Sequence, residues 1–330
     1  MTRILTRTHV EGLLTIREVI DAVELAHADL SNQLAIQPAP STLSFDPSDS
    51  AVLPMAARAK RQGLSVVKLL SDIPNNAARG LPVQRSVIVL VSEATGACEA
   101  IIDGQIPTRQ RTAAASAVAS RHLARRDSSV LGLVGAGNLA VEHVGAIAAV
   151  LPIVRVLVWS RTHKTVDSFI KRVNSLHPGL EVEAVGSAEE VVRRSELVCT
   201  LTPSREPLVR GEWFRAGQHI NAVGAPPRAD HREIDSIGIA RAKLFVDSVA
   251  TALKKSGDVL LAIADGAIGE GDVHQELGDV ISGKAPGRSS ADEITLFNSV
   301  GIALQDLAIG SLLVQRARAN NIGLELDMSS

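Results

Sequence analysis

Two kinds of apolar segment alternate along the second half of the chain. Val130–Val134 and Val154–Val158 are short, β-branched apolar runs, typical of buried parallel strands. The segment between them is rich in Ala, Val and Ile, is long enough for a helix and is broken at Pro152. The pattern therefore predicts a strand, a helix and a second strand, and the same alternation continues beyond Arg161.

The N-terminal part of the chain shows a different pattern. Thr15 and Glu18 form a capping box at the start of a helical apolar pattern that continues to Leu34. Short apolar runs separated by turn residues follow it at Ser65–Leu70, Ser86–Ser92 and Ala97–Ile102. These runs predict a mixed, largely antiparallel sheet.

A glycine-rich turn joins the first strand of the α/β alternation to its helix. Residues 135–140 read Gly-Ala-Gly-Asn-Leu-Ala, the form G-x-G-x-x-A. Gly135 allows a tight turn, Gly137 lets the backbone approach a pyrophosphate, and Ala140 lets the helix pack on the strand. The helix N-terminus then offers unpaired N–H groups to the phosphates. We interpret the turn as a dinucleotide site; the alternative is an ordinary glycine-rich turn.

The two patterns predict two domains. An Ala-rich helical segment, Thr112–Ala124, leads directly into the nucleotide-binding strand, and a long apolar helical segment covers Val300–Asn320. We expect residues 113–295 to form the nucleotide-binding domain, inserted into a domain made of residues 1–112 and 296–330. The predicted fold class is α/β, with a Rossmann-like dinucleotide-binding domain inserted in a mixed α/β domain.

Composition narrows the function classes. Of the 330 residues 45% are hydrophobic and the net charge is −2, so there is no basic footprint for nucleic acid. No apolar run is long enough to cross a membrane, and no secretory signal is recognised, so we expect a cytoplasmic protein without a membrane partner. Cys98 and Cys199 lie in strand-like runs and are interpreted as core residues of a reducing compartment, with no metal expected. The chain has no Tyr, so a tyrosine cannot be the general acid.

The end of the second strand bears on the choice of cofactor. An NAD-selective domain carries an acidic residue there to bind the ribose hydroxyls, but the sequence is Trp159, Ser160, Arg161, Thr162. A small hydroxyl residue followed by Arg and Thr suits a 2′-phosphate, so NADP(H) is favoured and NAD(H) remains possible. The alternative is that Arg161 only stacks on the adenine.

Several stretches together resemble the ornithine cyclodeaminase/mu-crystallin family. They are Val67-Lys68 before NNAARGLP, the segment Thr108–Ala114 (TRQRTAA), the Gly135-Ala136-Gly137 turn, Asn221–Ala225, Glu276–Gly278 and Leu296–Asp306 (LFNSVGIALQD). The resemblance implies a substrate and dimerisation domain built from both chain ends, a Rossmann-like domain between them, and a homodimer in which two N-terminal sheets close on each other. It also implies a nicotinamide cofactor and a small amino or imino acid substrate.

The resemblance also implies catalytic residues. Lys68 matches the active-site lysine near the substrate carboxylate and imine, where a buried lysine could bind the carboxylate or assist proton transfer. Arg111 matches the arginine of the R-T-A-A motif, whose guanidinium suits a carboxylate. The alternatives are a surface lysine whose stem packs on apolar neighbours and a helix-start arginine with a structural role.

The chain departs from the family pattern at several positions. The second family arginine, expected in a P-x-R segment, is absent near Pro40, while Arg109 is an additional arginine. We therefore hypothesise that Arg109 shares the substrate carboxylate with Arg111, which requires an extended entry into Thr112; otherwise Arg109 faces solvent or a partner. Pro226 occupies the position of the cyclodeaminase aspartate. Asp230 is a nearby candidate for catalysis, although a structural role is favoured, and His231 is interpreted as a loop histidine.

The predicted site therefore has two parts. The catalytic candidates are Lys68, Arg111, Arg109 and Asp230. The cofactor-binding candidates are Arg111, Thr112, Gly135, Ala136, Gly137, Asn138, Leu139, Ser160, Arg161, Thr162, Thr202, Val223 and Gly224.

The family resemblance, taken together with these residues, implies an NADP(H)-linked reductase of a small α-imino acid, equivalently an amino acid dehydrogenase. The substrate would be a cyclic ketimine such as pyrroline-2-carboxylate, or a linear imine. One alternative is an ornithine cyclodeaminase that uses bound NAD and releases ammonia. Another is a protein that binds NADPH and a small ligand without turnover, against which the presence of both Lys68 and Arg111 argues.

Overall fold

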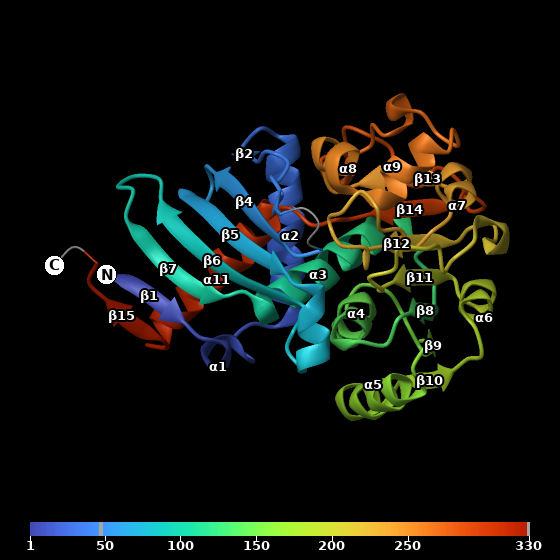
Figure 1. The fold of residues 1–330 in the computed structure, drawn as a ribbon, viewed down its shortest axis with the longest axis horizontal. Coiled ribbons are helices and arrows are strands. Elements are labelled where there is room, and N and C mark those ends of the chain that lie inside the picture. The colour runs from blue at the N-terminus through green and yellow to red at the C-terminus, as the bar shows by residue number, and fades with distance from the viewer. Residues whose placement is uncertain (46–48, 329–330) are drawn as a thin grey trace. The chain divides into compact units, whose positions relative to one another are not determined.

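The computed structural model describes residues 1–45 and 49–328, and the chain divides into two compact units. The first comprises residues 1–111 and 302–330, and the second residues 112–301 (Figure 1). Residues 46–48 and 329–330 of the predicted first domain lie outside the described residues. The predicted α/β class with a Rossmann-like domain is confirmed.

The first unit is built on an eight-stranded mixed sheet with the order β15-β1-β7-β6-β5-β4-β2, in which β3 pairs with β4. The pairing of β1 with β7 is parallel and the other pairings are antiparallel. The strands are β1 (Thr2–Leu5), β2 (Ala35–Ile36), β3 (Leu43–Ser44), β4 (Ala51–Ala59), β5 (Leu64–Asp72), β6 (Gln84–Ser92), β7 (Cys98–Asp103) and β15 (Leu324–Leu326).

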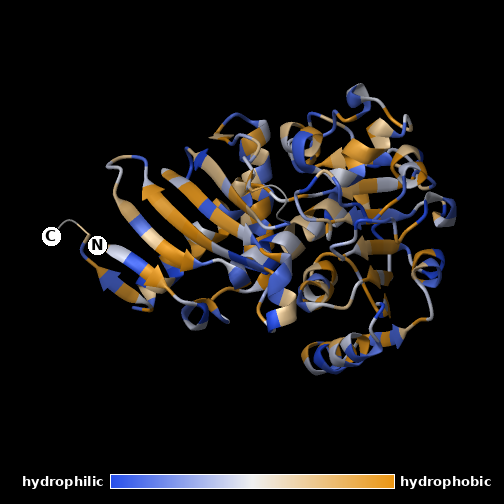
Figure 2. Ribbon diagram, viewed as in Figure 1, coloured by the Kyte–Doolittle hydropathy of each residue, from blue (hydrophilic) through white to orange (hydrophobic). Residues whose placement is uncertain are grey.

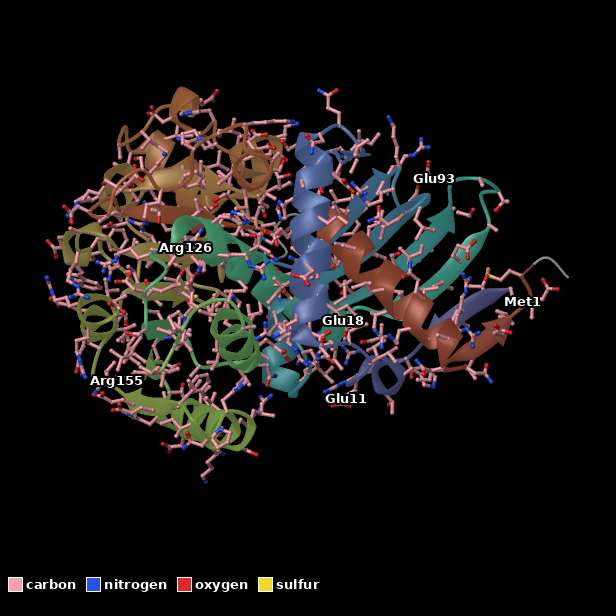
Figure 3. The ribbon with its side chains drawn as sticks, turned by 180° about the vertical axis from the view of Figure 1, so that it is seen from behind. Met1, Glu11, Glu18, Glu93, Arg126 and Arg155 are labelled. Carbon is pink, nitrogen blue, oxygen red and sulfur yellow. The ribbon has the colours of Figure 1, made fainter. Side chains whose placement is uncertain are left out.

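Helices cover one face of this sheet. The predicted capping box is confirmed, because Thr15 and Glu18 exchange hydrogen bonds at the start of α2 (Ile16–Ser31). Helix α11 (Ala303–Ala319) packs on α2 and on β4, β5 and β6, and Figure 3, which labels Glu18 on α2, shows both helices over the sheet. Two short elements complete this part of the chain, α1 (Arg7–Val10) and the 3-10 helix η1 (Pro74–Arg79).

The opposite face of the sheet is apolar and is left open by the helices of this unit. Along β5 the buried residues alternate with Val67 and Leu69, which are 44% and 42% exposed. Figure 2 shows that apolar residues predominate along β5, β6 and β7, and the alternation of burial assigns Val67 and Leu69 to the open face. One side of the sheet thus packs against helices and the other presents aliphatic side chains.

The second unit is built on a seven-stranded parallel sheet with the order β10-β9-β8-β11-β12-β14-β13. The strands are β8 (Val130–Val134), β9 (Arg155–Trp159), β10 (Glu181–Ala184), β11 (Leu197–Thr200), β12 (His219–Ala222), β13 (Lys243–Val246) and β14 (Thr295–Asn298). The helices are α4 (Asn138–Ala148), α5 (His163–Leu176), α6 (Ala188–Arg194), α7 (Ser236–Arg241), α8 (Val249–Lys255), α9 (Gly257–Ala264) and α10 (Leu277–Ile281), with the 3-10 helices η2 (Gly211–Trp213) and η3 (Glu270–Asp272). Aliphatic side chains from strands and helices form its core.

The second domain boundary differs from the prediction, which placed residues 296–330 in the first domain. The strand β14 pairs with both β12 and β13, and all four of its residues are buried. A strand that is buried on both faces and paired on both edges belongs to the sheet that surrounds it, so residues 296–301 lie in the second unit.

Helix α3 (Gln105–Leu123) begins seven residues before the predicted start at Thr112. Pro107 lies in its first turn, where a missing N–H costs no helical hydrogen bond. The amide of Thr108 donates to the carbonyl of Gly104 at 3.0 Å, the first hydrogen bond of the helix. The segment before Thr112 is therefore helical, and the extended entry that the Arg109 hypothesis requires is absent.

Residues 1–45 and 49–328 contain no helix that combines the length and the apolarity of a membrane span. Within the same ranges, no group of three or more His, Cys, Asp or Glu side chains is placed to hold a metal ion. Cys98 is half-buried in the first unit and Cys199 is buried in the second, and both are free thiols.

Candidate active site

Three charged side chains are buried together in the first unit. Lys68 on β5 and Asp306 on α11 are fully buried, and Arg111 on α3 is 5% exposed. The Lys68 ammonium donates to Asp306 Oδ1 at 3.0 Å, and Arg111 Nε donates to the same oxygen at 3.3 Å. Two cations thus share one carboxylate, and we call these three residues the Lys68 cluster.

Strand alternation places Lys68 inside the protein. Val66, Lys68 and Leu70 all point to the buried face of β5, which packs under α11. Burial lowers the pKa of the Lys68 ammonium to about 8; Asp306 opposes this shift and Arg111 adds to it. A lysine in this position exchanges its proton far more readily near neutral pH than an exposed lysine does.

A chain of buried hydrogen bonds orients Arg111. Its Nη1 donates to Gln305 Oε1 at 2.9 Å, and the Gln305 amide nitrogen lies 3.1 Å from His27 Nε2. Burial lowers the pKa of His27 to about 4, so the ring is neutral and Nε2 accepts the amide hydrogen. This acceptance fixes the Gln305 amide with its oxygen toward Arg111.

Two further contacts define the cluster. The Lys68 ammonium also donates to Thr108 Oγ1 at 2.8 Å, which lies one helical turn before Arg111 on α3. Asp306 Oδ2 is buried and has no hydrogen-bond partner among the described residues. The cluster therefore carries an excess of positive charge and one buried carboxylate oxygen that is available to accept a hydrogen bond.

Arg109 does not form the hypothesised clamp with Arg111. Both residues lie inside α3, where positions two residues apart are separated by about 200° around the helix axis. Arg111 is buried with Asp306, whereas Arg109 is only half-buried. The hypothesis required an extended segment, so the paired arrangement is wrong.

In the second unit, the glycine-rich turn forms a backbone cradle. Gly135 follows β8 with a φ of +114°, and a Cβ there would lie 2.8 Å from the Leu201 carbonyl oxygen. Gly137 is the N-cap of α4, and no side chain caps this helix end. A Cβ on Gly137 would meet open space. The first amides of α4, beginning at Asn138 and Leu139, are thus available to an anion, so the site fits a pyrophosphate.

The residues after β9 that the sequence analysis proposes for the cofactor lie at the surface of the second unit. Arg161 and Thr162 are exposed and Ser160 is half-buried. Arg161 makes no hydrogen bond or ion pair to any residue that the structure describes, so its guanidinium is available to a ligand.

The remaining cofactor candidates occupy the ends of two neighbouring strands. Thr202 follows β11, and Val223 and Gly224 follow β12. The buried Glu233 joins these segments, because it accepts hydrogen bonds from the amides of Thr202 and Gly224 at 2.6 and 2.7 Å. Ala136, the middle residue of the glycine turn, is buried. Thr112 is buried at the start of the second unit, whereas Arg111 is the last residue before it in the first unit.

Asp230 is an exposed member of an ion-pair group. Its side chain is 59% exposed and lies 2.9 Å from His231 Nδ1 and 3.1 Å from Arg205. Although partial burial acts in the opposite direction, His231 and Arg205 lower the pKa of this carboxyl. A carboxylate held in the ionised form is a poor general acid, so the geometry favours the structural role for Asp230.

Comparison with known proteins points to one family. The family model of the ornithine cyclodeaminase/mu-crystallin family matches residues 1–321. An alanine dehydrogenase from Archaeoglobus fulgidus is 35% identical over 325 residues, which cover 98% of each chain. A Δ1-pyrroline-2-carboxylate reductase from Bacillus cereus is 31% identical over 316 residues, or 96% of each chain.

A solved structure is also similar over almost the whole chain. The Δ1-pyrroline-2-carboxylate reductase of Thermococcus litoralis, in complex with NADH and L-proline, superposes with a TM-score of 0.95 at 35% identity. The match covers 98% of this chain and 100% of that one. This chain belongs to the ornithine cyclodeaminase/mu-crystallin family.

The family assignment confirms the resemblance on which the sequence-based site was built. The expectation of an oxidoreductase acting on a C=N or CH–NH bond is confirmed at the level of these reductase and dehydrogenase relatives. The individual site residues and the preference for NADP(H) stay predictions.

Four buried residues near the sites carried no assigned role in the sequence analysis: His27, Gln305, Asp306 and Glu233. Gln305 and Asp306 form an adjacent polar pair within a helix whose other neighbours are mostly apolar, and this break in the apolar pattern was a usable signal. Glu233 lies in a loop rich in charged residues, where nothing in the sequence distinguishes a buried carboxylate from an exposed one.

Proposed function

We propose that this member of the ornithine cyclodeaminase/mu-crystallin family reduces the C=N bond of a small α-imino acid with a nicotinamide cofactor. The substrate is a cyclic ketimine such as pyrroline-2-carboxylate, or a linear imine, and the reverse reaction is an amino acid dehydrogenation. The observation that carries the proposal is the burial of Lys68 and Arg111 around the single carboxylate of Asp306.

The charge of the Lys68 cluster favours a carboxylate ligand. Two buried cations and one buried anion leave an excess charge of one unit, and an unpaired buried charge is strongly unfavourable. The carboxylate of an α-imino acid would neutralise it, with the Arg111 guanidinium as the donor. Asp306 Oδ2, which lacks a partner among the described residues, suits the N–H of the substrate's imine or amine group.

Lys68 is suited to deliver the proton that the reaction needs. A hydride for the imine carbon would come from the nicotinamide cofactor when it is bound. The substrate nitrogen then requires one proton to become an amine, and the Lys68 ammonium, with its pKa near 8, can donate it at neutral pH. Asp306 holds Lys68 in place, and Gln305 with the neutral His27 holds Arg111.

We further propose that the cofactor is NADP(H) in preference to NAD(H). Three features support this choice: Arg161 is exposed, residues 159–162 include no acidic residue, and Ser160 and Thr162 carry hydroxyl groups. The Thermococcus litoralis relative holds NADH, so the comparison does not support a preference for NADP(H). The proposed preference rests on this chain's own residues and needs its own measurement.

The open apolar face of the first unit supports a homodimer. Val67 and Leu69 on β5 are more than two-fifths exposed, and their neighbours on the same face are aliphatic. An apolar sheet face of this kind is a typical protein interface, and the family resemblance implies that a second copy covers it.

The test is turnover. We expect the purified protein to oxidise NADPH with at least one member of a panel of α-imino acids and to form no proline from ornithine, because Pro226 stands where the cyclodeaminase aspartate is expected. Proline formed from ornithine with equimolar ammonia would instead support the cyclodeaminase. Cofactor binding without turnover of any substrate would support a binding protein.

A further inference from the structure

One buried carboxylate ties together the loops at the carboxyl edge of the parallel sheet. Glu233 is fully buried, and both of its oxygens accept two hydrogen bonds. Oε1 accepts from the amide of Thr202 at 2.6 Å and from its hydroxyl at 2.7 Å. Oε2 accepts from the Thr200 hydroxyl and the Gly224 amide, each at 2.7 Å. Glu233 therefore joins the segment after β11 to the segment after β12.

These segments leave one another almost no room. A Cβ on Gly224 would lie 2.0 Å from the Thr202 amide nitrogen, and a Cβ on Gly135 would lie 2.8 Å from the Leu201 carbonyl oxygen. Leu201 and Thr202 are thus packed between the glycine turn of β8 and the end of β12. Any displacement of Thr202 is transmitted directly to the backbone of the phosphate cradle.

Glu233 is itself held from a third element. Asp258 on α9 accepts hydrogen bonds from the amides of Glu233 and Ile234 at 2.9 and 3.1 Å. The side-chain amide of Asn298, at the end of β14, donates to the other Asp258 oxygen at 3.3 Å. The backbone of Glu233 is therefore held in place, and its carboxylate can position the two loops.

The sheet order places this group at the functional edge. Strands β9 and β10 lie on one side of β8, and β11 and β12 lie on the other. After β10 the chain crosses back to β11, so the strand order reverses at the boundary between β8 and β11. Dinucleotides bind at such a switch point, outside the carboxyl ends of the strands. The loops that Glu233 joins are those that follow β11 and β12.

We propose that Glu233 is a positioning residue for the nicotinamide cofactor, whose carboxylate holds the Thr202 and Gly224 backbones in their binding arrangement. This inference rests on the proposed use of a nicotinamide cofactor. Only a carboxylate satisfies the geometry, because a backbone N–H points at each of the two oxygens. A glutamine would direct its NH₂ group at one of these N–H donors and leave a buried donor unpaired.

The same geometry makes cofactor affinity depend on pH. Burial, aided by the nearby Asp258, raises the pKa of Glu233 to about 7. Burial also raises the pKa of Asp258 to about 6, although Arg232 acts in the opposite direction. The pKa of the Cys199 thiol on β11 is raised by burial to about 12. As the pH falls through about 7, a proton occupies one Glu233 oxygen and weakens its hold on a backbone N–H, so the dissociation constant for the cofactor is expected to rise.

The experiment measures NADH binding to the full-length protein by fluorescence titration. NADH is the probe because it lacks the 2′-phosphate, whose own ionisation would change with pH. We expect Glu233→Gln to raise the dissociation constant at pH 8 by at least about tenfold. The matched control is Glu196→Gln, which removes a carboxylate that accepts from Ser129 and Val130 at the amino end of the same sheet, and it is expected to change the constant less than about twofold.

A second measurement follows the pH dependence of NADH binding. The dissociation constant of the unchanged protein is expected to rise severalfold between about pH 8 and pH 6.5, and Glu233→Gln is expected to lose this dependence. If Glu233→Gln does not fold, the pH profile of the unchanged protein decides the question, and a flat profile overturns the proposal. Equal affinity of a folded Glu233→Gln also overturns it, while the proposed function survives. An unchanged protein that binds neither NADH nor NADPH overturns both.

Discussion

The two candidate sites offer different chemical groups to a ligand. In the first unit, Lys68, Arg111 and Asp306 come from three separate elements and act through buried side-chain charges. In the second unit, the glycine turn at 135–137 and the start of α4 act through the backbone, within one contiguous segment. A backbone site tolerates many side-chain changes, whereas the loss of one side chain from a buried charge cluster leaves an uncompensated charge.

The comparison predicts that single substitutions can remove catalysis while they leave cofactor binding intact. The largest such effect is expected for Lys68→Met. Loss of a general acid lowers kcat by about 10²- to 10⁴-fold. Binding of NADPH should be unchanged, because its predicted site is the backbone cradle of the other unit. Stopped-flow turnover and fluorescence titration measure the two quantities, with the exposed Lys60→Met as the control. A Lys68→Met variant with normal turnover would contradict the assignment of the proton donor.

The second test compares two arginines of one helix. Arg111→Met should lower kcat/KM for an imino acid by about 1.5–3 kcal/mol, or roughly 10- to 150-fold, because a charge-assisted bond to the carboxylate is lost. Arg109→Met should leave kcat/KM nearly unchanged, since α3 directs the two residues to different faces. Steady-state kinetics with thermal melting distinguish a lost contact from a lost fold, and an equal effect of the two variants would argue against Arg111 as the carboxylate ligand.

The third test uses pH. The pKa of Lys68 is lowered from its ordinary value of 10.5 to about 8, so the protonated form predominates below pH 8 and is lost above it. The kcat/KM for imine reduction should therefore fall by about tenfold per pH unit above about pH 8, while amine oxidation, which needs the neutral lysine, should rise over the same range. A reduction rate that stays constant up to about pH 10 would indicate a different donor.

The smallest expected effect is at the exposed end of the cofactor site. NADPH should bind at least about tenfold more tightly than NADH, and Arg161→Ala should remove most of this difference, since one charge-assisted bond to a phosphate is worth about 1.5–3 kcal/mol. Calorimetric titration of both cofactors measures it, with the exposed Lys171→Ala further along α5 as the control. Equal affinities in the unchanged protein would leave Arg161 without a role in selectivity.

The sequence by itself determined the parts of the fold that depend on local patterns. The βαβ unit around Gly135, the capping box at Thr15 and the antiparallel strands of the first unit all follow from short periodicities and turn residues. Strand alternation is local too, and the family resemblance singled out Lys68 and Arg111. These features are written within a few consecutive residues, so they can be interpreted without knowledge of the rest of the chain.

The tertiary structure alone decided which distant residues meet. The start of α3 was misjudged because the sequence does not show that Pro107 lies in a first turn. The predicted domain boundary after residue 295 cut through β14 because the strand's partners are distant in sequence. Glu233 was missed for the same reason, whereas Asp306 was missed although it interrupts the apolar pattern of its helix. The charge and hydrogen bonding of a buried carboxylate are set by neighbours that only chain folding supplies, and for Glu233 those neighbours are the amides of Thr202 and Gly224.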